Sequence, residues 1–311
     1  MKTSEVLIVL ALVLVVAMTF VAVLLAIYAV YALSTPRECI GIIQIDGEIS
    51  TKTQSGGLFG TPTVGSNDIV RQIEDAESRD DVKAVVFEVN SPGGSVVASK
   101  EIYEAVRSMK KPRVAYFREV AASGGYYISA GTDFIVSEPD ALTGSIGVIA
   151  TFEDMSGLFN KLGINYTIMK SGELKDMGSP SRPMTEKERA IMQSIINDIF
   201  GEFRRVVEEG RGNKLNKTKF EEILDARVLT GRQAVDVGLV DELGNEKEAI
   251  KAAGRLGDIK FTKEPPVCNM KSSNPVDSIF SGIGQGITYA LRELVSINGV
   301  NDVRGVSVSY N

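Results

Sequence analysis

The sequence contains no histidine, and this absence excludes most of the common hydrolytic mechanisms. The Ser-His-Asp triad, the Cys-His pair and the HExxH zinc site all require an imidazole. If the chain catalyses proton transfer, its base has to be Asp, Glu, Lys, Tyr, Cys or a terminal amine.

Cysteine and basic charge are also scarce. The two cysteines, Cys39 and Cys268, are too few for a disulfide framework and lack the spacing of a metal site. Whether they pair depends on geometry, so the sequence leaves that open. The net charge of −6 argues against nucleic acid as a partner. With 44% hydrophobic and 24% charged residues, the 311-residue chain has the composition of a globular protein with a sizeable core.

The longest apolar run extends from residue 6 to residue 33 without a charge. As a helix it would be about 42 Å long, more than the roughly 30 Å hydrocarbon core requires. A cleaved signal peptide is the alternative, but its apolar stretch is typically only about 7–15 residues. We therefore predict one N-terminal transmembrane helix and a cell-membrane location. The weak lysine bias favours an extracytoplasmic position for the rest of the chain.

Beyond this run, segments typical of strands and helices alternate, which predicts an α/β fold with a largely parallel sheet. A later helix is predicted to begin at Thr185, which forms a capping-box pattern with Glu188. Its apolar stripe, from Ile191 to Val206, is expected to face a core or a partner subunit. The expected strands are Cys39–Ile45, Val82–Val89, Arg113–Phe117, Asp133–Val136 and Asn165–Met169, and helices are expected over 67–78, 95–109 and 152–162.

Two glycine-rich turns follow predicted strands, where open α/β sheets place their sites. Residues 90–94 read Asn-Ser-Pro-Gly-Gly, and residues 121–125 read Ala-Ala-Ser-Gly-Gly. Such turns leave backbone amides free to stabilise an oxyanion, and small neighbours expose the hydroxyl of Ser123. The simpler interpretations are a plain strand–helix turn and an N-cap serine.

A serine nucleophile in this chain needs a base other than histidine. Lysine can serve where burial lowers its pKa towards 7. Lys175 is the leading candidate, because it lies in an irregular loop over residues 170–180 and not in a charged helix. Lys170 in the same loop competes with it, and a solvated loop lysine is the alternative for either residue.

Four motifs in order give the sequence a resemblance to a known family: NSPGG at 90–94, AASGGYY at 121–127, TGSIGV at 143–148 and SGELKDM at 171–177. Together they resemble the signal peptide peptidase A family, which comprises membrane-anchored serine proteases with a Ser-Lys dyad. The resemblance covers about residues 40–256. It implies the ClpP/crotonase fold of repeated ββα units. The expected organisation is an anchor over 1–37, a peptidase domain over 38–263, and a linker with a possible amphipathic helix over 264–311.

The resemblance also implies roles for individual residues. Ser123 corresponds to the nucleophile, Lys175 to the general base and Ser145 to the hydroxyl that orients the lysine. The amides of Gly94 and Gly124 correspond to the oxyanion hole. No cofactor or metal is implied. The expected partners are remnant signal peptides and other apolar or misfolded polypeptides, the lipid bilayer, and further copies of the chain in a ring.

Three alternatives stay open at this stage. A stomatin-cleaving, NfeD-type membrane protease of the same fold also uses a Ser-Lys dyad. A crotonase-like acyl-CoA enzyme would use the glycine-turn amides but would leave Ser123 without a role. An inactive membrane scaffold would use the glycines only for packing.

Overall fold

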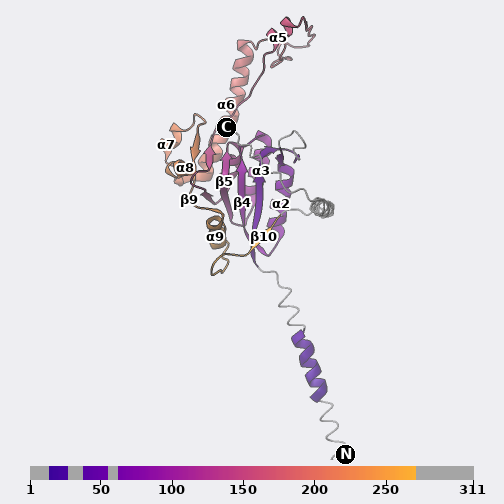
Figure 1. The fold of residues 1–311 in the computed structure, drawn as a ribbon, viewed down its shortest axis with the longest axis vertical. Coiled ribbons are helices and arrows are strands. Elements are labelled where there is room, and N and C mark those ends of the chain that lie inside the picture. The colour runs from indigo at the N-terminus through magenta and orange to yellow at the C-terminus, as the bar shows by residue number, and fades with distance from the viewer. Residues whose placement is uncertain (1–13, 27–37, 55–61, 271–311) are drawn as a thin grey trace, which may run out of the picture. The chain divides into compact units, whose positions relative to one another are not determined.

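The structure is a computed structural model that describes residues 14–26, 38–54 and 62–270 (Figure 1). Residues 14–26 are helical. No helix in the described ranges is both long and apolar enough to cross a membrane. The remainder of the apolar run over 6–33, and the segment 276–297, lie outside the described residues.

A mostly parallel eight-stranded sheet forms the centre of the domain (Figure 1). Its main path runs β10-β1-β4-β5-β6-β9, and every neighbouring pair on that path is parallel. β7 pairs parallel with β5 and antiparallel with β8, while β2 and β3 form a separate parallel pair. The strands are β1 Cys39–Asp46, β2 Glu48–Ser50, β3 Thr63–Gly65, β4 Val82–Ser91, β5 Arg113–Ala122, β6 Phe134–Ser137, β7 Leu142–Gly144, β8 Val228–Thr230, β9 Glu242–Leu243 and β10 Val267–Asn269.

Helices cover both faces of this sheet, as the buried strand sequences require. The side chains of β4 alternate between the faces, because successive residues of a strand point in opposite directions. Val85, Phe87 and Val89 join the larger core with α2 and α3, whereas Ala84 and Val86 join a smaller core with α9. The helices are α2 Ser66–Ser78, α3 Val96–Ser108, α4 Gly124–Ser129, α5 Ser156–Lys161, α6 Glu186–Arg211, the 3-10 helix η1 Gly212–Lys214, α7 Lys217–Glu222, α8 Gly231–Val237 and α9 Glu246–Leu256.

The predicted α/β fold with a largely parallel sheet is confirmed, but two local expectations are wrong. Residues 165–169 form no strand, since they run as exposed irregular chain with no neighbouring strand to pair with. The helix expected over 152–162 is limited to α5, which buries no side chain. The capping box at Thr185 and Glu188 is present and begins α6.

A disulfide links the first strand of the sheet to the last. Cys39 at the start of β1 bonds Cys268 in β10, with a Cα–Cα distance of 5.8 Å. β10 lies within the segment 264–311 that the sequence assigned to a tail, and three of its residues pair with β1. The disulfide settles the pairing that the sequence left open, and the parallel register sets Cys268 opposite Gly41, two residues from Cys39.

Candidate active site

Ser123 lies at the sharp turn between β5 and α4, at the carboxyl end of a central strand. Its backbone has φ +52° and ψ −120°, a conformation that non-glycine residues rarely adopt and that costs about 1–3 kcal/mol. Two hydrogen bonds hold it: its N–H donates to the carbonyl of Gly144 at 2.9 Å, and its carbonyl accepts from the Tyr127 N–H at 2.9 Å. Strain of this kind is typical of a nucleophile elbow, which lifts the hydroxyl out of the backbone.

The other glycine-rich turn packs directly against this elbow. A Cβ placed on Gly93 would stand 2.6 Å from the Gly124 nitrogen and 2.9 Å from the Ser123 Cβ, so only glycine fits there. Gly94 has φ +151° and lies against the backbone of Ile49. Within the described part of the chain, the Gly94 and Gly124 amides have no hydrogen-bond acceptor. Two unsatisfied N–H groups beside a serine can stabilise a developing oxyanion.

A cavity of about 130 Å³ opens beside Ser123. Tyr127 and Phe203 stiffen its wall, because their rings meet edge to face at 5.1 Å. Burial raises the pKa of Tyr127 to about 12, so its hydroxyl stays protonated at neutral pH. The cavity can hold an apolar side chain next to the serine. It is lined by Gly94, Val96, Ser99, Lys100, Ser123, Gly124, Tyr127, Gly147, Val148, Ile149, Ile199, Glu202 and Phe203.

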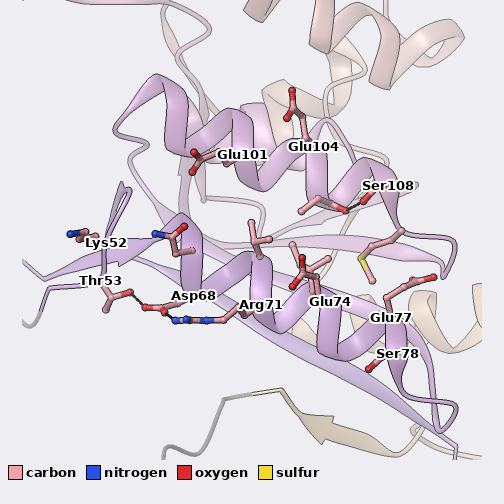
Figure 2. A pocket seen from close by; sticks show the side chains of 15 residues that line it. Lys52, Thr53, Asp68, Arg71, Glu74, Glu77, Ser78, Glu101, Glu104 and Ser108 are labelled. Atoms are coloured by element: carbon pink, nitrogen blue, oxygen red, sulfur yellow. Dashed lines mark hydrogen bonds and ion pairs between the residues drawn. The ribbon is translucent and has the colours of Figure 1, made fainter.

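A larger groove, of about 1120 Å³, runs between α2 and α3 but is remote from this chemistry (Figure 2). Charged side chains line it, among them Asp68, which accepts from Thr53 at 2.5 Å and pairs with Arg71. It contains neither Ser123 nor the free amides. In the described ranges, no three Cys, Asp or Glu side chains are grouped as a metal site would require.

Ser145 lies in the turn after β7, close to the elbow in the fold. Its φ is +49°, and its N–H donates to the carbonyl of Arg227 at 3.0 Å. The carbonyl of the preceding residue, Gly144, accepts a hydrogen bond from the Ser123 N–H. This bond links the backbone turns that hold the two strained serines. Ser145 does not belong to the lining of the 130 Å³ cavity.

Lys175 lies outside that cavity. Its side chain is exposed, in a series of turns over residues 171–178. The structure therefore brings Ser123, Gly94 and Gly124 together but leaves Lys175 apart from them within one chain. Lys170 forms hydrogen bonds within its own loop. Its Nζ donates to Asp176 at 2.6 Å and to the Glu173 carbonyl at 2.8 Å.

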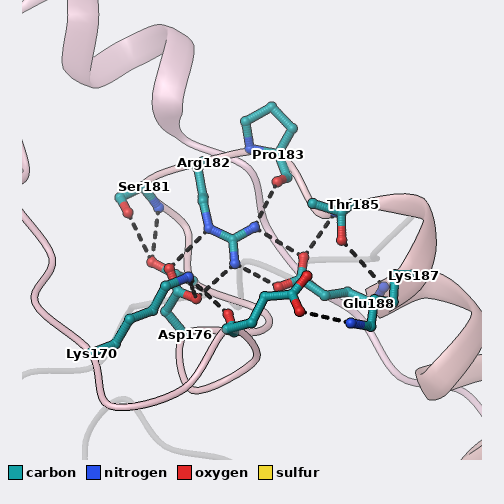
Figure 3. A network of polar contacts seen from close by, with 10 residues as sticks. Lys170, Asp176, Ser181, Arg182, Pro183, Thr185, Lys187 and Glu188 are labelled. Atoms are coloured by element: carbon teal, nitrogen blue, oxygen red, sulfur yellow. Dashed lines mark hydrogen bonds and ion pairs between the residues drawn. The ribbon is translucent and has the colours of Figure 1, made fainter.

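A network of ion pairs fixes the chain on both sides of the Lys175 turn (Figure 3). Arg182 bridges Asp176 at 2.8 Å and Glu188 at 2.5 Å, and Glu188 also accepts from the Thr185 N–H. Arg182 lowers the pKa of Glu188 to about 2 and holds the pKa of Asp176 far below its usual range. Asp176, the residue after Lys175, is thereby tied to the first turn of α6.

Sequence reasoning missed most of the cavity wall. Val96 and Ser99 belong to α3, and Ile149 follows the β7 turn, so these residues meet only in the folded domain. One available signal was the helix directly after Gly93-Gly94. Its first turns border the same cavity as the free amide of Gly94. Ser99 lies on the buried side of that helix, next to Ala98 and Ile102.

Comparisons with known proteins agree with this geometry. The profile of peptidase family S49 matches residues 105–260, and the Clp protease profile matches residues 62–135. A putative protease of Methanocaldococcus jannaschii is 37% identical over 252 residues, covering 79% of this chain and 80% of that protein. The putative signal peptide peptidase SppA of Enterococcus faecium is 38% identical over 211 residues, covering 67% of this chain and 60% of that protein.

A solved structure is also similar. A membrane-bound stomatin-specific protease superposes with a TM-score of 0.50, covering 76% of this chain and 99% of that chain. The sequence identity is 19%, so the likeness concerns the fold alone.

Proposed function

Since the chain belongs to peptidase family S49, the signal peptide peptidase A family, and is a serine peptidase, we propose that it hydrolyses apolar polypeptides with a Ser123–Lys175 dyad. The observation that carries the proposal is the strained Ser123 beside two amides without acceptors, at the mouth of an apolar cavity. The absence of histidine leaves lysine as the base that fits this arrangement.

In the proposed reaction, the neutral Lys175 amine takes the proton of Ser123, and the serine oxygen attacks the scissile carbonyl carbon. The amides of Gly94 and Gly124 donate to the oxygen that becomes negative. When the C–N bond breaks, the lysine returns its proton to the leaving amine. Water then attacks the acyl-enzyme, with the lysine again accepting a proton, and release of the acid restores the Ser123 hydroxyl.

The position of Lys175 implies that the dyad is completed by assembly. Most large apolar side chains between residues 149 and 169 are exposed, with Ile149 at 87% and Met169 at 92%. A concentration of exposed apolar side chains in one segment is typical of a protein interface. We propose that copies of the chain form a ring that buries these side chains and carries Lys175 into a Ser123 cavity, where desolvation favours the neutral form of its amine.

The proposed substrates are remnant signal peptides and other membrane or misfolded polypeptides, because the cavity beside Ser123 is mainly apolar. We also propose that the apolar run over residues 6–33 anchors the chain in the cell membrane. The Cys39–Cys268 disulfide supports an extracytoplasmic peptidase domain, since disulfides persist in oxidising compartments.

The test is cleavage of a fluorogenic apolar peptide by the full chain in detergent, across pH. We expect both Ser123→Ala and Lys175→Ala to lower kcat by at least about 10³-fold. Lys217→Ala, which removes an exposed lysine of α7 outside the proposed interface, should keep the wild-type rate. The wild-type rate should rise with pH through a single lysine ionisation. Wild-type rates in Ser123→Ala or Lys175→Ala would refute the dyad.

Mixing the two inactive variants tests the assembly. If the lysine of one copy serves the serine of another, a mixture of Ser123→Ala and Lys175→Ala subunits regains part of the activity after exchange. If each dyad forms within one chain, the mixture stays inactive. A wild-type protein that cleaves as a monomer in sedimentation experiments would refute the ring.

A further inference from the structure

Ser99 carries a buried hydroxyl that has no hydrogen-bond partner among the described residues. The residue lies in α3 and is 3% exposed. Within the described part of the chain, its Oγ is the single buried side-chain nitrogen or oxygen that makes no hydrogen bond. Leaving such a group unsatisfied costs about 1–3 kcal/mol. A structural serine would avoid this cost, so the hydroxyl calls for another explanation.

The other buried serines show how the fold ordinarily satisfies such a group. Ser129, in α4, donates to the carbonyl of Gly125 four residues earlier, at 2.7 Å. Ser137 donates to the Glu138 carbonyl at 2.8 Å. Ser99 makes no such bond, although the Ser95 carbonyl lies four residues before it and accepts its N–H at 3.0 Å. The Ser99 hydroxyl is therefore directed away from the backbone of its own helix.

It is directed towards the catalytic elbow. Ser99 lines the same cavity as Ser123. A Cβ placed on Gly124 would collide with the Ser99 hydroxyl and would stand 3.3 Å from the Gly94 nitrogen. The hydroxyl and the Gly94 amide thus approach Gly124 from the same side. Gly124 is the first residue of α4, so its own N–H is free of the helix ladder.

We propose that the Ser99 hydroxyl is a third donor to the scissile carbonyl oxygen, beside the Gly94 and Gly124 amides. This rests on the proposed peptidase function. The O–H donates to the oxygen as it gains negative charge, and such a charge-assisted bond is stronger than one to a neutral carbonyl. Because the hydroxyl is satisfied only when that oxygen is present, the bond favours the transition state over the free enzyme.

Two opposite effects are therefore expected from Ser99→Ala. Removing the hydroxyl lowers kcat by about 10²- to 10³-fold, with KM changed by less than about twofold, as expected for the loss of one oxyanion donor. Removing an unsatisfied polar group leaves the unfolding midpoint unchanged or raises it. Ser137→Ala is the matched control, because it removes a satisfied buried hydroxyl that does not line the cavity. It should lower the midpoint and leave kcat unchanged.

The experiment uses the full chain and combines peptide cleavage, thermal unfolding, and the rate at which a fluorophosphonate probe labels Ser123. The oxygen of the probe's P=O group gains negative charge in the same site as the serine attacks phosphorus, so Ser99→Ala should slow labelling by a factor similar to the fall in kcat. A kcat within twofold of wild type would overturn the proposal, as would a fall in kcat that merely follows a loss of stability. Failure of the peptidase assignment is distinguishable, because then the wild-type protein shows no Ser123-dependent cleavage or labelling.

Discussion

The disulfide between Cys39 and Cys268 offers the sharpest test of how the domain is held together. It joins the first residue of β1 to β10 at the edge of the sheet. The cross-link therefore closes almost the whole described domain into one loop. The perturbation is replacement of both cysteines by serine in the full chain, compared with the oxidised wild type and with the wild type under a phosphine reductant.

The size of the effect follows from the length of the closed loop. The two cysteines are 229 residues apart, and the chain-entropy relation for that length gives about 5.5 kcal/mol. Measured contributions of disulfides are typically about 2–4 kcal/mol. The strand pairing of β10 adds little further stability, since β10 pairs with β1 over only three residues. We expect the free energy of unfolding to fall by about 2–5 kcal/mol.

The assay is urea unfolding followed by far-ultraviolet circular dichroism and by tyrosine fluorescence, since the chain has no tryptophan. Reduced wild type and the double serine variant should show the same loss. Without denaturant, kcat should stay within about twofold of wild type, because the disulfide lies at the amino end of β1 and the site lies at the carboxyl ends of β4 and β5. A loss below about 1 kcal/mol would refute the loop-entropy reasoning.

Two further outcomes follow from the elbow and from a buried ion pair. Gly124→Ala should lower kcat by about 10²-fold while the fold persists, because its Cβ would collide with Ser99; wild-type kcat would contradict this packing. Burial alone would raise the pKa of Asp241, but hydrogen bonds from Arg211 and Lys214 outweigh it and the pKa is lowered. Asp241 therefore stabilises the fold above about pH 4, and this contribution is lost as the pH falls through the lowered pKa. Asp241→Asn should lower the free energy of unfolding in urea by about 3–5 kcal/mol at pH 7, because it leaves the buried Arg211 without its carboxylate partner. As the pH falls towards 3, the stability of this variant should decrease less steeply than that of the wild type.

The sequence by itself determined the alternation of elements and the place of the two glycine-rich turns. Buried runs such as Val82–Val89 predict strands because their apolar content is local, and the capping box at Thr185 predicts the start of α6 for the same reason. Glycine pairs after strands predict free amides because their backbone freedom is intrinsic to the residue. The family resemblance, which rests on four short motifs, is confirmed by the profile match.

Predictions from local sequence pattern were insufficient where a segment has no neighbouring element to pack against. Residues 165–169 have the composition of a strand, yet a strand needs a partner, and the part of the chain that the structure describes offers none there. Lys175 is a similar case. Its position next to the anchored Asp176 is decided by Arg182 and Glu188, and its exposure shows that no described part of the chain covers it.

Only the tertiary structure decided which distant residues share a site. Ser99 is an ordinary helical serine in the sequence. Its significance is visible only once α3 packs against α4, where its hydroxyl lies beside Gly124 with no hydrogen-bond partner in the described ranges. The pairing of Cys39 with Cys268 likewise depends on the parallel register of β1 and β10. Hydrophobic period and turn chemistry are properties of a few neighbouring residues, whereas hydrogen-bond satisfaction and sheet register are properties of the whole fold.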